Sequence, residues 1–145
     1  MSTYVPATLR KQVTKRAGGH CEYCRFPQSV ALLSFEMEHI ISEKHGGMTV
    51  PENLALACPY CNRAKGSDLG SLDPQTQQLT PFFNPRTQEW SEHFLFSDAT
   101  IVPQTAEGRV TVLILQFNDS ERLQERATLI ATGFALTPPQ SNRSV

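Results

Sequence analysis

The residues of this sequence with the clearest chemistry are its four cysteines, which form two Cys-x-x-Cys pairs: Cys21, Cys24, Cys58 and Cys61. A two-residue spacing lets two thiolates of a tight turn converge on one metal ion, and two such pairs complete a tetrahedral four-thiolate zinc site. Because a closed site has no open position for a substrate, we expect it to stabilise the fold. A four-thiolate iron site suits this spacing as well, and free or disulfide-bonded thiols are the remaining alternative.

Three polar residues beside the cysteine pairs form a second group that can do chemistry. Glu38 and His39 lie between the pairs, and Asn62 directly follows Cys61. An imidazole gains and loses a proton near neutral pH, so His39 suits the role of a general base that activates water. A carboxylate and an amide oxygen are hard ligands, so Glu38 and Asn62 suit one Mg²⁺ or Mn²⁺ ion that keeps its other positions for water and phosphate oxygens.

The elements that must position these residues form a small finger. Residues 6–17 read as an amphipathic helix, and residues 34–41 alternate like a half-buried strand. A short helical turn is expected over 53–57, and a helix is expected to start within 58–61 and to run to about Gly66. Adjacent strand residues point to opposite faces, so Glu38 and His39 can reach one phosphate only where the strand ends or bulges.

The remainder of the chain, rich in Gln, Thr, Pro and Phe, reads as an extension. One or two short strands are expected over 94–102, whereas residues 110–117 suit a helix or a strand equally well. Asp119 or Ser120 can cap a final helix. We expect a core domain over residues 1–69, an extension packed on it over 70–136, and a disordered tail over 137–145.

Five short segments occur in an order that resembles the HNH endonucleases of the ββα-metal (His-Me finger) class. They are Cys-Glu-Tyr-Cys, Glu-His-Ile-Ile, His-Gly-Gly, Glu-Asn-Leu-Ala-Leu-Ala-Cys and Cys-Asn-Arg-Ala-Lys-Gly, and the resemblance covers residues 10–69. Each segment alone is weak, but the composite order is specific. The resemblance implies an α+β fold, in which a ββα-metal (HNH) finger is stapled by the two Cys-x-x-Cys zinc knuckles and followed by a mixed α/β extension.

The same resemblance implies a divalent-metal-dependent DNA endonuclease that hydrolyses phosphodiester bonds. His39 would be the general base, Glu38 and Asn62 would hold the Mg²⁺ or Mn²⁺, and zinc at the cysteines would be structural. Asn53 matches the family position whose side chain bonds across the loop and orients the histidine. Asn62 stands where the name-giving pattern has histidine, which favours Mg²⁺ or Mn²⁺ over softer ions. Three further residues are expected to bind substrate: Arg63, Lys65 and His45.

The charge and hydropathy of the chain indicate which kinds of partner it can bind. The net charge of the whole chain is −1, but residues 1–70 carry eight Lys and Arg against six Asp and Glu, a net +2. This half is therefore the expected site of contact with nucleic acid, in the first place double-stranded DNA. The sequence lacks an apolar run of membrane-spanning length and a secretory leader, so we expect no membrane partner and a cytoplasmic location.

Each chain would carry one such active site, and one active site cuts one strand, so double-strand cleavage would need a homodimer or two successive events. Two alternatives to an enzyme remain. The chain can be a catalytically silent, zinc-stabilised nucleic-acid-binding module, or a protein-interaction module with weak affinity for DNA.

Overall fold

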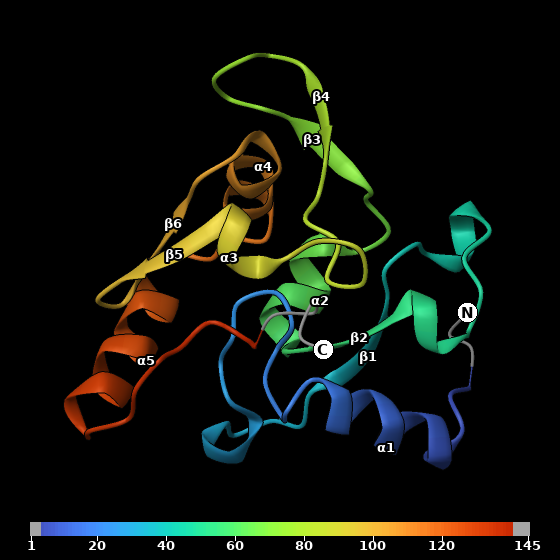
Figure 1. Ribbon diagram of the computed structural model, residues 1–145, viewed down its shortest axis with the longest axis horizontal. Helices are drawn as coiled ribbons and strands as arrows, with labels where there is room; N and C mark the ends of the chain where they lie inside the picture. Colours follow the sequence, from blue (N-terminus) through green and yellow to red (C-terminus); the bar gives the residue numbers. More distant parts are fainter. Residues whose placement is uncertain (1–3, 141–145) are drawn as a thin grey trace. The chain divides into compact units, whose positions relative to one another are not determined.

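The computed structural model of the chain describes residues 4–140 and has the predicted mixed α+β architecture, which confirms the fold class (Figure 1). The chain divides into two compact units, Met1–Leu69 and Gly70–Val145. Among the described residues, every sheet is a two-stranded antiparallel hairpin. None of the helices within residues 4–140 is long and apolar enough to cross a membrane.

The first unit contains a hairpin and two helices: α1 (Ala7–Arg16), β1 (Glu36–His39), β2 (Leu54–Ala57) and α2 (Pro59–Lys65). Pro6 precedes α1 with φ −59°, and Gly18 and Gly19 follow the helix with positive φ, so both ends agree with the predicted helix. Contacts join α1 to β2 and α2 to β1. These contacts bury Val13 of α1 and all four residues of β2.

The expected helical turn over residues 53–57 was wrong. A 3-10 turn occupies Pro51–Asn53, and the next four residues form β2, which pairs His39 with Leu54 and Glu38 with Ala55. Leu and Ala favour helices on intrinsic propensity. Here the apolar Leu-Ala-Leu-Ala run is instead buried on both faces as the partner of β1, and this packing overrides propensity.

The second unit consists of two hairpins and three helices: β3 (Gly70–Leu72), β4 (Leu79–Pro81), α3 (Trp90–His93), β5 (Phe94–Ser97), β6 (Thr100–Pro103), α4 (Ala106–Ile114) and α5 (Ser120–Ala131). The expected strands at 94–102 and the final helix are present as β5, β6 and α5. The segment 110–117, for which the sequence favoured helix and strand equally, begins within α4. The side chain of Thr105 caps this helix by accepting from the Gly108 N–H at 3.0 Å.

Aromatic side chains supply much of the core of the second unit. The ring of Phe94 lies 5.3 Å from that of Phe83, 5.1 Å from that of Trp90 and 5.5 Å from that of Phe117. All four residues are buried. Of the predicted tail, residues 137–140 have no regular secondary structure, and 141–145 lie outside the described residues.

Candidate functional site

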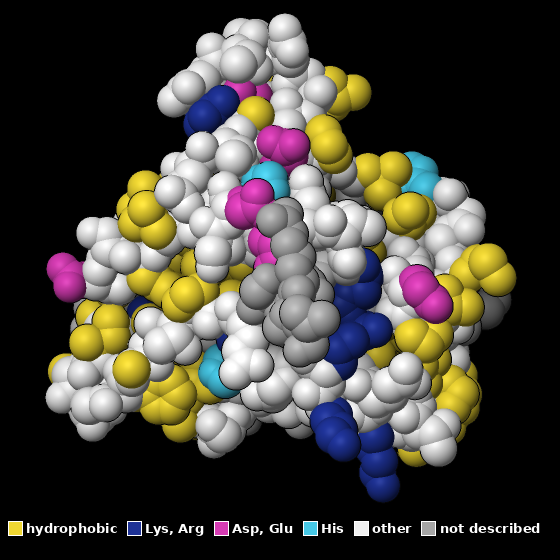
Figure 2. Space-filling view, viewed as in Figure 1, with side chains coloured by type: hydrophobic (Ala, Val, Ile, Leu, Met, Phe, Trp, Pro, Cys, Tyr) yellow, Lys and Arg dark blue, Asp and Glu magenta, His cyan; other side chains and the backbone are white. Residues whose placement is uncertain are grey.

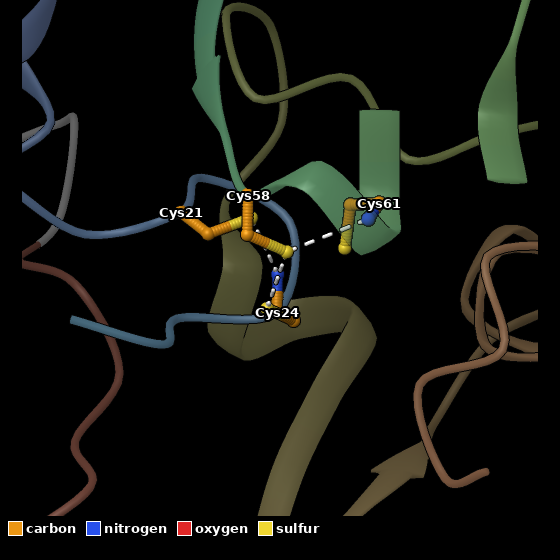
Figure 3. A group of neighbouring side chains, drawn as sticks. All are labelled: Cys21, Cys24, Cys58 and Cys61. Atoms are coloured by element: carbon orange, nitrogen blue, oxygen red, sulfur yellow. Dashed lines mark hydrogen bonds between the residues drawn. The ribbon is translucent and has the colours of Figure 1, made fainter. Parts of the chain in front are cut away.

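The four cysteines converge on one buried point (Figure 3), with their sulfur atoms all within 4.8 Å of one another. The Sγ atoms of Cys24 and Cys58 are 3.7 Å apart. Four sulfurs around one zinc ion at the usual Zn–S distance of about 2.3 Å lie about 3.8 Å apart, so this spacing fits a tetrahedral ion and is far too long for a disulfide. Backbone N–H groups of Cys24 and Cys61 point at the first sulfur of each pair, at 3.5 and 3.4 Å.

Without a bound metal, the surroundings of the cysteines favour neutral thiols. Hydrogen bonding to the sulfurs of Cys21 and Cys24 raises the pKa of the Cys58 thiol, and burial raises the pKa of Cys61. Four thiolates therefore cannot share this buried space without positive charge between them. A bound divalent metal supplies that charge and deprotonates its thiol ligands. The four sulfurs are thus arranged to hold a metal ion, as the cysteine spacing predicted.

A second feature is an open cavity of about 550 Å³ at the end of β1. Its lining combines three of the predicted site residues with the loop that follows the strand: Met37, Glu38, His39, Ser42, Glu43, Lys44, Asn62 and Gly66. β1 ends at His39, so Glu38 and His39 are the last two residues of the strand. Glu38, His39 and Asn62 come from two elements and meet at one cavity.

His39 is half-buried, and its Nε2 lies 2.9 Å from the Oγ1 of Thr49. With the Nε2 proton donated to the threonine oxygen, the lone pair of the neutral ring is on Nδ1. Nδ1 is then the atom that can accept a proton from water. Sequence reasoning missed Thr49, because a lone threonine in a loop carries no pattern that connects it to a histidine ten positions earlier.

Asn53 acts on the loop after β1. Its Oδ1 accepts from the Ile41 N–H at 2.9 Å, and its Nδ2 donates to the carbonyls of Ile41 and Met48, each at 2.9 Å. Only glycine fits at position 47 of this loop, because an added Cβ would lie 1.6 Å from the Ile41 oxygen. The asparagine therefore holds the backbone next to His39 and makes no direct bond to the ring that the structure records.

Glu36 is an exposed carboxylate next to Asn62, and the sequence reasoning did not single it out. The Nδ2 of Asn62 donates to the Oε2 of Glu36 at 2.7 Å. The sequence did contain a signal for Glu36. This residue precedes Glu38 by two positions, so the two glutamates lie on the same face of the strand.

Glu38 has a different environment. Its side chain is 2% exposed, and its two oxygens accept from the Tyr23 hydroxyl at 2.5 Å and the Lys65 ammonium at 2.8 Å. Lys65 also donates to the Ile40 carbonyl at 2.8 Å. Burial raises the pKa of Glu38, and the Lys65 charge opposes this shift.

The predicted substrate-binding residues thus lie in different surroundings. Arg63 and His45 are exposed, whereas Lys65 is buried in an ion pair with Glu38. A phosphate could meet the Lys65 ammonium only if this pair opened. The role of Lys65 at the substrate stays a prediction.

Comparison with known proteins supplies one finding on the family. The model of the HNH endonuclease family matches residues 21–68, the segment that contains both cysteine pairs and all the cavity-lining residues. Neither the curated proteins nor the solved structures contain a match to the chain. Residues 21–68 are therefore similar to the HNH endonuclease family, and they contain four cysteines placed to hold a metal ion.

Proposed function

We propose that the protein is a divalent-metal-dependent DNA endonuclease that nicks one strand per active site. The observation that carries this proposal is the cavity of the HNH segment, which is lined by both His39 and Asn62. An imidazole and an oxygen ligand beside one open space are the groups that hydrolysis of a phosphodiester requires.

In the proposed mechanism, Nδ1 of His39 takes a proton from the attacking water while Thr49 holds the opposite edge of the ring. Asn53 keeps the following loop in place. Asn62 and a carboxylate of β1 fit one Mg²⁺ or Mn²⁺. The sequence points to Glu38 for that carboxylate, and Glu36 is the second candidate because it contacts Asn62. When bound, this ion would stabilise the charge that develops on the phosphate and on the leaving 3′ oxygen.

The cysteine site would hold a structural zinc ion, separate from the catalytic ion. Basic side chains of the same unit supply the contact with the DNA backbone. Figure 2 displays Lys and Arg side chains gathered over α1, whose four basic residues are all exposed: Arg10, Lys11, Lys15 and Arg16. With Arg63 and His45 they favour a polyanionic partner.

The test is cleavage of supercoiled plasmid by the purified full chain with Mg²⁺ or Mn²⁺. We expect relaxed circles from the wild type, their loss in His39→Ala, and their retention in Glu52→Gln, which changes an exposed glutamate outside the cavity. Protein that binds DNA or RNA but cuts neither would overturn the endonuclease and favour the silent binding module. Protein that does not bind nucleic acid at all would favour the protein-interaction module.

A further inference from the structure

The two glutamates of β1 each contact one residue of α2, and we call these two successive side-chain pairs rungs. Glu36 and Glu38 are two residues apart on a strand, and Asn62 and Lys65 are three apart on a helix, so each pair projects from one face of its element. Glu36 bonds Asn62, and Glu38 bonds Lys65. The rungs occur in the same order along both elements. One is exposed at Glu36, and the other is buried on both sides.

The buried rung already satisfies the carboxylate of Glu38. Lys65 neutralises its charge, and the hydroxyl of Tyr23 donates to its other oxygen. A metal ion on this carboxylate would displace at least one of these partners. Displacing Lys65 would leave an ammonium group that is 2% exposed without its counter-ion, which is strongly unfavourable.

The exposed rung has a smaller obstacle, because an ion there would displace only the hydrogen bond between the Asn62 amide and the Glu36 carboxylate. The carboxylate of Glu36 is exposed to solvent, and its described partner is the neutral amide of Asn62. A hydrated divalent ion prefers carboxylate and amide oxygens that leave most of its water shell in place. The Nδ2 of Asn62 faces Glu36, so an ion held by both side chains would replace this hydrogen bond, with the amide turned so that its Oδ1 faces the carboxylate.

We propose that the two glutamates have separate roles. Glu36 shares the catalytic ion with Asn62, and Glu38 is a positioning residue that fixes β1 to α2 and to the first cysteine pair. The part that concerns the ion rests on the proposed function. The positioning part stands on the buried contacts of Glu38 with Tyr23 and Lys65.

The position of Tyr23 extends this role to the cysteine site. Tyr23 lies between Cys21 and Cys24, and its neighbour Glu22 exchanges two bonds with Leu56 of β2, at 2.8 and 2.9 Å. The loop that carries the first two thiols is thereby tied to both strands of the hairpin. An ion held by the four cysteines thus helps to set where His39 and Asn62 stand.

The first test measures Mn²⁺ affinity by electron paramagnetic resonance on the zinc-loaded full chain. Glu36→Gln should weaken Mn²⁺ binding at least about tenfold, since losing a ligand costs no less than losing a ligand's supporting partner. Glu38→Gln should bind Mn²⁺ as the Glu52→Gln control does. Unchanged affinity in Glu36→Gln, lost affinity in Glu38→Gln, or a wild type that binds no Mn²⁺ would overturn the proposal.

The second test is a double-mutant cycle between Glu38→Gln and Lys65→Met. Each single change leaves one buried charge unpaired and should lower the melting temperature, whereas the double variant removes both charges and should recover part of the loss. In plasmid nicking, kcat should fall in Lys65→Met with KM for DNA unchanged, and should recover in the double variant. Strictly additive effects would overturn the positioning role.

These measurements separate the two proposals. A wild type that binds Mn²⁺ through Glu36 but never nicks DNA would refute the endonuclease and leave the division of roles intact. If Glu38→Gln does not fold, the double variant takes its place in the Mn²⁺ titration, because it carries neither of the two buried charges.

Discussion

At the scale of single residues, the site depends on how one imidazole is held. Thr49 contacts His39 from a loop, and its hydroxyl oxygen can accept a hydrogen bond from the Nε2–H, which leaves the lone pair of the ring on Nδ1. The residue thus favours the tautomer of His39 whose lone pair is on Nδ1. Such a role is invisible in the sequence, because it depends on one side-chain contact and on no spacing rule.

This contact gives a prediction for nicking. Thr49→Val removes the hydroxyl at nearly constant volume and should lower kcat about tenfold, the equivalent of one lost hydrogen bond of about 1.4 kcal/mol. Thr49→Ser retains the hydroxyl and should retain most of the rate. Steady-state nicking kinetics on supercoiled plasmid would measure both, and equal rates in wild type and Thr49→Val would contradict the role.

At the scale of elements, the sequence predicted the features that follow from residue spacing and periodicity. It missed the features that depend on a single tertiary contact. The four cysteines, α1, α2 and β1 follow from spacing and periodicity, and the structure contains them. β2 was misread because its Leu and Ala residues suit a helix until β1 pairs with them. Glu36 and Glu38 have the same side chain and opposite environments, which only the neighbouring helix reveals.

The loop after β1 gives a second prediction. Gly47→Ala places a Cβ against the Ile41 carbonyl and close to the Asn53 amide, so the backbone must move. We expect a loss of about 1–3 kcal/mol in the free energy of unfolding, as for other overpacked sites. Gly19→Ala is a useful comparison, because no atom lies within 4 Å of its added Cβ, although its positive φ carries strain of its own. Urea denaturation would measure both variants, and equal losses would argue against the steric account.

In the second unit, an ion pair joins the β3–β4 hairpin to α4 and gives a pH-dependent prediction. Arg109 donates to both oxygens of Asp73 at 2.8 Å, and this bonding lowers the pKa of the aspartate. A depressed native pKa stabilises the fold above the unfolded value of about 3.9, and the gain is lost as pH falls below it. The urea midpoint of the wild type should therefore drop more between pH 6 and pH 3 than that of Asp73→Asn. Parallel pH profiles would contradict this.

At the scale of the whole molecule, the four-cysteine metal site is confined to one of the two compact units. Metal analysis of the purified chain should find one zinc per chain, whereas a coloured protein would indicate iron. Chelation should unfold residues 1–69 first, because a small unit depends on its metal for folding free energy. Far-UV circular dichroism during chelation and zinc re-addition would follow this, and an unchanged spectrum on metal removal would contradict it.

The hydrogen bond from Tyr23, which lies between Cys21 and Cys24 in the sequence, to Glu38 of β1 has a consequence for how the protein matures. A newly synthesised chain without an ion at its four cysteines would lack this anchor for β1. The proposed nicking of DNA would then appear only after metal loading, and oxidants that consume the thiols would abolish it before they damaged any residue that lines the cavity.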